Sequence, residues 1–477
     1  MVWAAFAAAL VLRLVLVSTV DHSFTDGLEL RYLVSTLSMA SGQGLLHATQ
    51  DAATEQRADT AARERQIAGG RIDPEHPYPI SARGYVPATL HPPGYSLLLL
   101  GYYAIGNFDG MVMLTRVTSA LLDASVCVFL FLFVRNLFGV APALVAAWVW
   151  VLLPAPMLML LALKPDAFSC FFAALVLCLA SYTRLGRPWA WAQTGVAVGV
   201  ASCFRPEFLA WPAVLFVCAW IDSGRLWRSI AGAAMMGFAM LALLSPWLLW
   251  TYHAEGRPML SSASAGGSMY EALGEDPANP WGVKLNDAWV DDDARKRGFT
   301  TAWSPEADEF YRKLYWQCVR EHPGAWVRNI VVNRLPGGLV PLFELPSSDH
   351  RFFYDYRQRE GLTRLGVVMK HPDMVLKHKG PALLMATLSA LLAVAMLAAA
   401  VIKRRRWRQA TWLVLPWLFV IAALSVVKQI EPRNVVGLVV LQASAAGVVI
   451  EHVIAGWQRR WEARGAARPC PMAEQKA

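Results

Sequence analysis

The chain has 477 residues, of which 56% are hydrophobic and only 17% are charged. Soluble domains carry roughly 25% charged residues, so the composition excludes a soluble globular protein and indicates a polytopic membrane protein. The formal net charge of +9 comes mostly from arginine. Such charge is compatible with nucleic-acid binding, but membrane proteins carry it in cytoplasmic loops as a topology signal. Its distribution along the chain favours the second interpretation.

Ten apolar segments approach the length of about 20 residues that a transmembrane helix needs. The predicted spans are 2–20, 112–134, 140–161, 167–183, 189–204, 207–221, 229–251, 380–402, 410–427 and 434–456. The segment 94–106 is shorter and aromatic, so we expect it to lie in the membrane interface rather than to cross the membrane. The predicted fold class is an all-α polytopic membrane protein, a bundle of about ten transmembrane helices.

The positions of Lys and Arg orient this bundle. The junctions near residues 135, 185, 225 and 405 and the tail after 457 are basic and nearly free of acid, so the positive-inside rule assigns them to the cytoplasm. Two long segments then face the extracytoplasmic side, where we expect interfacial helices. The predicted organisation is a first helix (1–20), a first extracytoplasmic loop (21–111), a central bundle (112–251), a large extracytoplasmic loop (252–379), C-terminal helices (380–456) and a basic cytoplasmic tail (457–477).

Three short outer turns carry cations where the positive-inside rule expects none. They read LALKPDAF, CFRPEF and VVKQIEPRNVV, and each also contains an acid. Charges at membrane depth cost about 2.5–3.5 kcal/mol each and usually face a functional cavity. Cations around a cavity open to lipid would bind a phosphate or diphosphate headgroup; alternatively, each pair neutralises itself and caps a helix. The predicted phosphate ligands are Lys164, Arg205, Lys428 and Arg433, which Arg116 near the outer end of the second span could join.

The segment after the first span, VDHSFTDGLELRYLVSTLSMASGQG, places acids at the mouth of that helix. Asp26 would be ionised near neutral pH and could act as a base; the alternative is an ordinary solvated loop. His91 projects from the turn TLHPPGY toward the same side, as a headgroup contact or as a structural residue. We expect Asp123 to make a helix-to-helix hydrogen bond and Arg13 to snorkel or pair. No pair of His residues has metal-ligand spacing.

These segments together resemble the GT-C superfamily of integral-membrane glycosyltransferases. The resemblance follows the order of the acidic first loop, HPPGYSLLLLGYYAIG, LTRVTSALLDASVCVFLFLFVRNLFG, LKPDAF, FRPE, SPWLLWTYHAEGRP and EPRNVV. Within the superfamily, the chain looks most like the branch of bacterial aminoarabinose transferases and protein O-mannosyltransferase-related enzymes. The resemblance implies a polyprenyl-phosphate-linked sugar donor, a bacterial inner-membrane location and an active site on the extracytoplasmic face.

The resemblance also implies roles for individual residues. Asp26 matches the family's catalytic Asp, Asp166 matches a second acidic position, and Arg433 matches the Arg that precedes the last span. His91 occupies a place where relatives often carry a phosphate-contacting residue. The usual Arg-Tyr pair before the last span is Arg433-Asn434 here, so an aromatic contact is missing.

The spacing in the first loop departs from the family pattern. Relatives place a Tyr three to five residues after the catalytic Asp, whereas Tyr32 follows Asp26 by six residues. Glu29, or even Asp21, could therefore be the aligned acid.

Three functions are weighed on these residues. The first is inverting glycosyl transfer from a polyprenyl-phosphate sugar to a hydroxyl of a lipid, glycan or protein, with an Asp general base and cations that stabilise the departing phosphate. The second is a transporter or flippase for the same lipids, although such proteins usually combine discontinuous helices with internal repeats. The third is a non-enzymatic assembly protein. No protein metal site is predicted, and the need for a divalent metal at the phosphate is left open.

Overall fold

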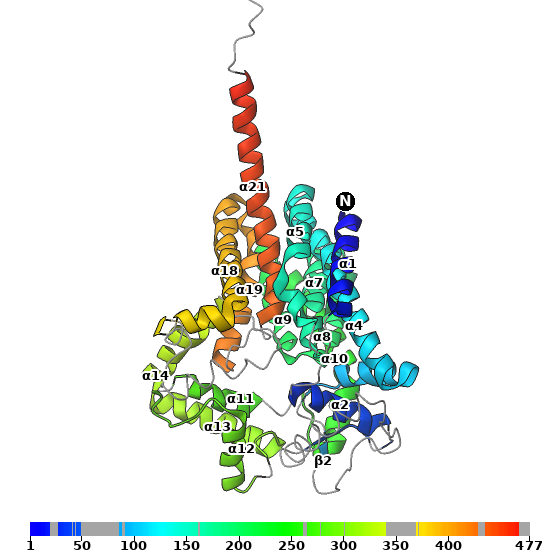
Figure 1. Ribbon diagram of the computed structural model, residues 1–477, viewed down its shortest axis with the longest axis vertical. Coiled ribbons are helices and arrows are strands. Elements are labelled where there is room, and N and C mark those ends of the chain that lie inside the picture. Colours follow the sequence, from blue (N-terminus) through cyan, green and yellow to red (C-terminus); the bar gives the residue numbers. More distant parts are fainter. Residues whose placement is uncertain are drawn as a thin grey trace, which may run out of the picture.

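The computed structural model describes residues 1–19, 27–40, 42, 44–48, 85–87, 91–160, 163–260, 265–276, 278–299, 301–339, 369–370, 372–427 and 435–466. Most of these residues form helices, and the apolar helices pack side by side into one bundle (Figure 1). The bundle comprises α1 (Val2–Thr19), α4 (Gly94–Phe138), α5 (Val140–Leu152), α6 (Pro154–Met159), α7 (Asp166–Ser181), α8 (Trp189–Phe204), α9 (Trp211–Ser223), α10 (Leu226–Glu255), α18 (Pro372–Ile402), α19 (Trp407–Val427) and α21 (Val439–Ala466).

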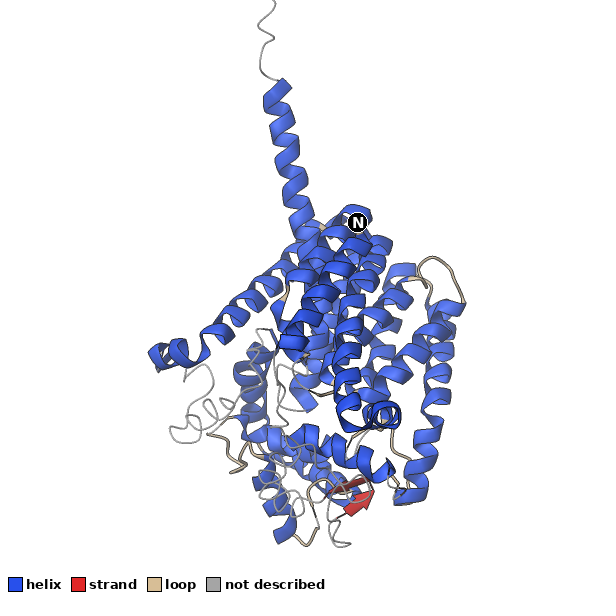
Figure 2. Ribbon diagram, turned by 45° about the vertical axis from the view of Figure 1, so that its right-hand side comes forward, coloured by secondary structure: helices blue, strands red, loops and turns tan. Residues whose placement is uncertain are grey.

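The remaining elements gather at one end of the bundle, which we call the loop end. They include α2 (Gly27–Ala40), α11 (Ala265–Glu271), α12 (Asp287–Lys296), α13 (Pro305–Glu321) and α14 (Pro323–Arg328). Two short strands, β1 (Leu46–Ala48) and β2 (Tyr85–Pro87), pair antiparallel at the same end (Figure 2). The N-terminus and the last turns of α21 lie at the opposite end (Figure 1).

This architecture confirms the predicted all-α membrane fold. The apolar runs of the sequence become the bundle helices, although three of these helices extend beyond the predicted spans: α4 begins at Gly94, α18 begins at Pro372 and α21 ends at Ala466. Among the described residues, five helical segments are long and apolar enough to cross a membrane: Val2–Thr19, Gly94–Phe138, Leu226–Glu255, Arg404–Val427 and Val436–Glu462. Shorter apolar helices lie beside them at Val140–Leu152, Asp166–Ser181 and Thr387–Ile402. The number of ten crossings and the division of the chain into inner and outer segments stay predictions.

The predicted span 140–161 is not one continuous helix. It divides into α5 and α6, and Leu153 between them is extended (φ −74°, ψ 118°). The cause is Pro154, because a proline lacks the N–H that a helix needs and disfavours the helical conformation of the residue before it. The chain therefore carries a helix break inside the bundle.

The segment 94–106 is helical and is set off from the span that follows. Gly106 (φ −136°, ψ 19°) and Asn107 (φ 56°, ψ −158°) leave the helical conformation and kink α4. Asn107 has the one positive φ among the described non-glycine residues, a conformation that Asn adopts more readily than most residues. The first part of α4 therefore runs across the loop end, close to α2, before the second part enters the bundle (Figure 1).

The loop end contains a second hydrophobic core that the sequence analysis did not predict. Tyr311 and Tyr315 of α13 are fully buried in it and pack with residues of α11 and α12. Ser304 caps α13 by accepting a hydrogen bond from the N–H of Ala307 at 3.3 Å. Burial raises the pKa of Tyr270 to about 12. We call α11 to α13 the helical subdomain.

Buried polar side chains fasten this subdomain to the bundle. Tyr315 Oη donates to the carbonyl of Val426 at 2.6 Å and accepts a hydrogen bond from Trp326 Nε1 at 2.7 Å. Arg334, which ends a π-helical turn (Asn329–Arg334), donates to the carbonyl of Ser425 at 2.7 Å. The last carbonyls of a helix have no partner within it, so these donors satisfy the end of α19.

Candidate functional site

The turn that carries His91 packs against the end of α8. Gly94, at the start of α4, makes this approach possible: a Cβ on it would lie 2.6 Å from the carbonyl oxygen of Cys203. No larger residue fits there without a shift of backbone. Cys203 is two residues before Arg205, so the motifs HPPGY and CFRPEF lie side by side.

Asp166 and Arg205 form a buried ion pair at the same place. Arg205 Nη1 donates to Asp166 Oδ1 at 2.5 Å, and Arg205 Nε donates to Glu207 Oε1 at 2.6 Å. Only 2% of Asp166 and 7% of Arg205 is exposed. The motifs LKPDAF and CFRPEF, about forty residues apart in sequence, are thus joined.

The prolines of these motifs explain the local backbone. Pro206 disfavours the helical conformation of the preceding residue, so α8 ends and Arg205 is extended (φ −142°, ψ 116°). Pro165 precedes α7 and puts Asp166 in its first turn, where the helix dipole favours a negative charge. Each Pro therefore presents a charged neighbour at a helix terminus.

Lys164 is also buried, two residues before Asp166. We call Lys164, Asp166, Arg205 and Glu207 the charge cluster. It contains two cations and two carboxylates, and both carboxylates bind Arg205. Arg205 therefore pairs with the acid of its own turn, Glu207, as the alternative of self-neutralising pairs predicts. Oδ2 of Asp166 is buried and has no hydrogen-bond partner among the described residues.

A series of aromatic rings connects the first loop to the charge cluster. His91 stacks on Tyr32 of α2 with ring centroids 5.0 Å apart. Tyr95 meets Tyr32 edge-on at 5.1 Å and Phe168 at 5.8 Å. Phe168, two residues after Asp166, stacks on Phe204, the residue before Arg205, at 5.4 Å. The sequence did not identify Tyr95 as part of the site, and Tyr32 was noted only because it follows Asp26 by six residues.

The start of the last helix meets α7 one turn from Asp166. Cys170 Sγ donates to the carbonyl of Val436 at 3.4 Å, and a Cβ on Gly437 would lie 3.4 Å from the carbonyl oxygen of Ser169. Val436 begins a 3₁₀ turn (Val436–Leu438) before α21. The end of the motif EPRNVV is therefore next to the charge cluster.

Several predicted residues are not joined to the cluster by the described structure. Asp26, Lys428 and Arg433 lie outside the described residues, and Glu29 lies in α2 with its side chain outside them. Arg116 is half-buried on the second part of α4. Their roles stay predictions.

The pairing predicted for Arg13 and the helix-to-helix role predicted for Asp123 are confirmed, and the two residues are each other's partners. Arg13 Nε donates to Asp123 Oδ2 at 2.5 Å, and both side chains are at most 1% exposed. The same guanidinium donates to the carbonyls of Trp150 and Val151 at 3.1 Å each. These groups stabilise the end of α5 rather than the charge cluster.

Among the residues that the structure describes, no group of three or more His, Cys, Asp or Glu side chains could hold a metal ion. The arrangement instead offers acceptor and donor groups for an oxyanion and for hydroxyl groups. Asp166 and Lys164 are both buried, and Asp166 lies two residues before Phe168 of the aromatic series, which reaches Tyr32 of α2.

Comparison with known proteins agrees with this chemistry. Residues 90–250 match the family model of dolichyl-phosphate-mannose-protein mannosyltransferases. The match covers about a third of the chain, includes His91, Lys164, Asp166 and Arg205, and supports the predicted resemblance to the GT-C membrane glycosyltransferases. No curated protein sequence matches the chain significantly.

Two solved structures have a similar arrangement of helices. The oligosaccharyltransferase AglB of Archaeoglobus fulgidus, in complex with an inhibitory peptide and a dolichol-phosphate, has 13% identity and a TM-score of 0.43, over 80% of this chain and 45% of its own. ArnT of Cupriavidus metallidurans, bound to undecaprenyl phosphate, has 15% identity and a TM-score of 0.37, over 94% of this chain and 77% of its own. This chain thus spans less than half of AglB, and both scores are too low to assign an activity.

Proposed function

We propose that this relative of the GT-C glycosyltransferases transfers a sugar from a polyprenyl-phosphate-linked donor to an acceptor hydroxyl on the extracytoplasmic side of the membrane. One observation carries the proposal: three turns that are far apart in sequence converge on one buried charge cluster, and the described residues of that cluster fall within the family match at 90–250. The loop end would be the extracytoplasmic end.

The base in this reaction would be an acid of the first loop, Asp26 or Glu29. It takes the proton of the acceptor hydroxyl as that oxygen forms a bond to the anomeric carbon. The bond from this carbon to the phosphate oxygen breaks, and the lipid phosphate leaves with the electron pair. Inversion at the anomeric carbon follows from this single displacement.

The charge cluster would hold the phosphate and sugar. Lys164 would supply positive charge to the departing phosphate. Arg205 binds two carboxylates and would orient them. Lys428 and Arg433 would supply the remaining positive charge. Oδ2 of Asp166 would accept a hydrogen bond from a sugar hydroxyl, since Oδ1 is held by Arg205. Asp166 then acts as an orienting acceptor rather than as the proton-abstracting base.

The transporter or flippase alternative gains one observation from the structure, the break between α5 and α6. Transporters often bind substrate at such discontinuous helices. Here the carbonyls of Trp150 and Val151 at the break bind Arg13, so they are not presented to a substrate. Transfer remains the function that the geometry supports better.

A cell lacking the protein provides the test. We expect it to accumulate the lipid-linked donor and to lose one sugar from a glycan, lipid or protein, and the wild-type chain should reverse both effects. Asp26→Asn, which is nearly the same size, should fail to do so although it reaches the membrane in normal amount, because removing a general base typically costs about 10²–10⁴-fold. Glu29→Gln and Asp21→Asn are run beside it to locate the base. If all three variants restore transfer, the first loop is not the catalytic centre.

A further inference from the structure

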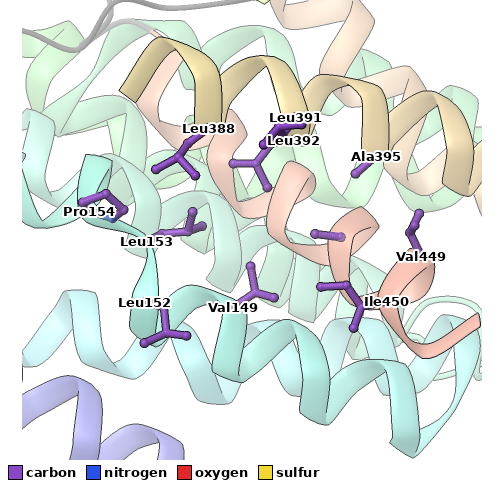
Figure 3. A pocket seen from close by; sticks show the side chains of 11 residues that line it. Val149, Leu152, Leu153, Pro154, Leu388, Leu391, Leu392, Ala395, Val449 and Ile450 are labelled. Carbon is purple, nitrogen blue, oxygen red and sulfur yellow. The ribbon is translucent and has the colours of Figure 1, made fainter. Parts of the chain in front are cut away.

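An apolar groove with a volume of about 360 Å³ opens on the bundle between α5, α18 and α21 (Figure 3). All eleven side chains that line it are aliphatic or proline. Two of them, Leu152 and Leu391, are 75% and 60% exposed, so the groove opens toward the bilayer. A polar headgroup or a sugar would find no hydrogen-bonding side chain there. A hydrocarbon chain needs none and would bury its apolar surface against these side chains.

The groove exists because α5 stops early. Leu152, Leu153 and Pro154, at the break between α5 and α6, form one wall of it. A continuous helix would give the carbonyl of Trp150 a partner four residues later, but that residue is Pro154, which has no N–H. The N–H of Leu153 donates to this carbonyl at 3.3 Å instead. An unsatisfied carbonyl costs several kcal/mol within a membrane.

A buried ion pair supplies further hydrogen-bond donors at this break. Arg13 donates to the carbonyls of Trp150 and Val151, and Asp123 balances its charge. The pair lies outside the charge cluster and takes no part in the proposed transfer. Its position shows that the break is supported by dedicated residues, so the groove is a built feature of the bundle.

The position of the groove along the membrane normal indicates which lipid can reach it. Val436 lies beside α7, one turn from Asp166. Ala446 and Ile450, which line the groove, follow Val436 by ten and fourteen residues, which corresponds to about 15 and 21 Å along a helix. Half of the hydrocarbon core is about 15 Å thick. The groove therefore begins near the bilayer midplane when the charge cluster lies at the membrane surface.

An acyl chain anchored on the cluster's side of the membrane would end near the midplane, whereas a polyprenyl chain continues beyond it. We propose that the groove binds the distal isoprene units of the donor's polyprenyl chain while the charge cluster binds its phosphate. This inference rests on the proposed function and adds selectivity for chain length to it.

The experiment fills the groove and measures binding. Ala395, on the α18 wall, is half-buried and is replaced by Trp. The control is Val394→Trp, because Val394 is the next residue on the same helix, is 62% exposed and does not line the groove. Purified wild type and both variants are titrated with a long-chain polyprenyl phosphate and with farnesyl phosphate, and thermal unfolding confirms that each variant is folded. Ala395→Leu serves in its place if Ala395→Trp unfolds.

Wild type and the control should bind the long chain more tightly than farnesyl phosphate. Ala395→Trp should lose about tenfold or more in affinity for the long chain, the factor expected when roughly two methylene groups lose their burial, and should bind farnesyl phosphate normally. Equal affinity of wild type for both lipids, or unchanged long-chain binding by the folded variant, would overturn the inference. So would a phospholipid that copurifies and that the long chain does not displace. Binding of neither lipid by wild type would instead overturn the proposed function.

Discussion

The ion pair within the charge cluster makes a quantitative prediction about stability. Replacing Arg205 by Met removes the cation that two carboxylates now bind, those of the buried Asp166 and of Glu207, whose side chain is 13% exposed. Removing one partner of a buried pair typically costs about 3–5 kcal/mol because the remaining charge is uncompensated. The second variant, Asp166→Asn, keeps its shape and leaves Arg205 paired with Glu207. It exchanges a charge-assisted hydrogen bond for a neutral one, so we expect a loss of about 1–2 kcal/mol.

The double variant of Arg205 and Asp166 distinguishes an ion pair from two independent residues. Because it removes one of the stranded charges, we expect it to be more stable than Arg205→Met alone. Thermal unfolding of the purified proteins measures all three. Arg257→Met is the matched control, since its partner Glu309 lies 3.2 Å away and both side chains are exposed, and exposed pairs contribute at most about 1 kcal/mol. Wild-type stability of Arg205→Met, or strictly additive effects in the double variant, would refute the reasoning.

Three other predictions concern the donor site, the subdomain and the topology. Arg433→Ala should raise the donor KM by about tenfold or more in a transfer assay, because a hydrogen bond to an ionised oxygen is worth about 1.5–3 kcal/mol; an unchanged KM would make it a topological residue. Tyr315→Phe removes the hydroxyl that donates to Val426 and accepts from Trp326. At about 0.5–1.5 kcal/mol for each hydrogen bond, the free energy of unfolding should fall by about 1–3 kcal/mol, and no change would mean that these contacts contribute nothing. Reporter fusions at Arg405 and Asp308 should read opposite sides of the membrane, and identical readings would overturn the orientation.

The helices of the bundle were predictable because long apolar runs have few alternatives to a membrane span. Pro154 is a local sequence signal for the helix break at Leu153. The prediction of one span over 140–161 was wrong because it followed the hydropathy of the segment and not this proline. The capped start of α13 was readable too, since Ser304 and Pro305 are typical of a helix N-terminus. The second core was not predicted, because the apolar residues that build it, such as Tyr311 and Tyr315, are spaced along a long segment that is polar overall.

The site itself was only partly predictable. Cations in turns that were predicted to be extracytoplasmic identified Lys164 and Arg205 as unusual under the positive-inside rule, and Asp166 lies in the same turn as Lys164. Their mutual arrangement could not be read from the sequence, because it depends on how α7 and α8 pack. The packing of these helices makes Arg205 a counter-ion shared by two carboxylates, and its predicted role as a phosphate ligand stays a prediction.

The pair of Arg13 and Asp123 also has a consequence for biogenesis. During synthesis, α1 must enter the membrane before Asp123 has been made, and an arginine near the centre of a lone helix costs about 2.5–3.5 kcal/mol on insertion scales. Asp123 is supplied by α4, and the carbonyls of Trp150 and Val151 come later still, with α5. All partners of Arg13 in α1 are therefore in place only after α5 has been inserted. Chains truncated before Val151 should be degraded faster than longer ones by the cell's quality control.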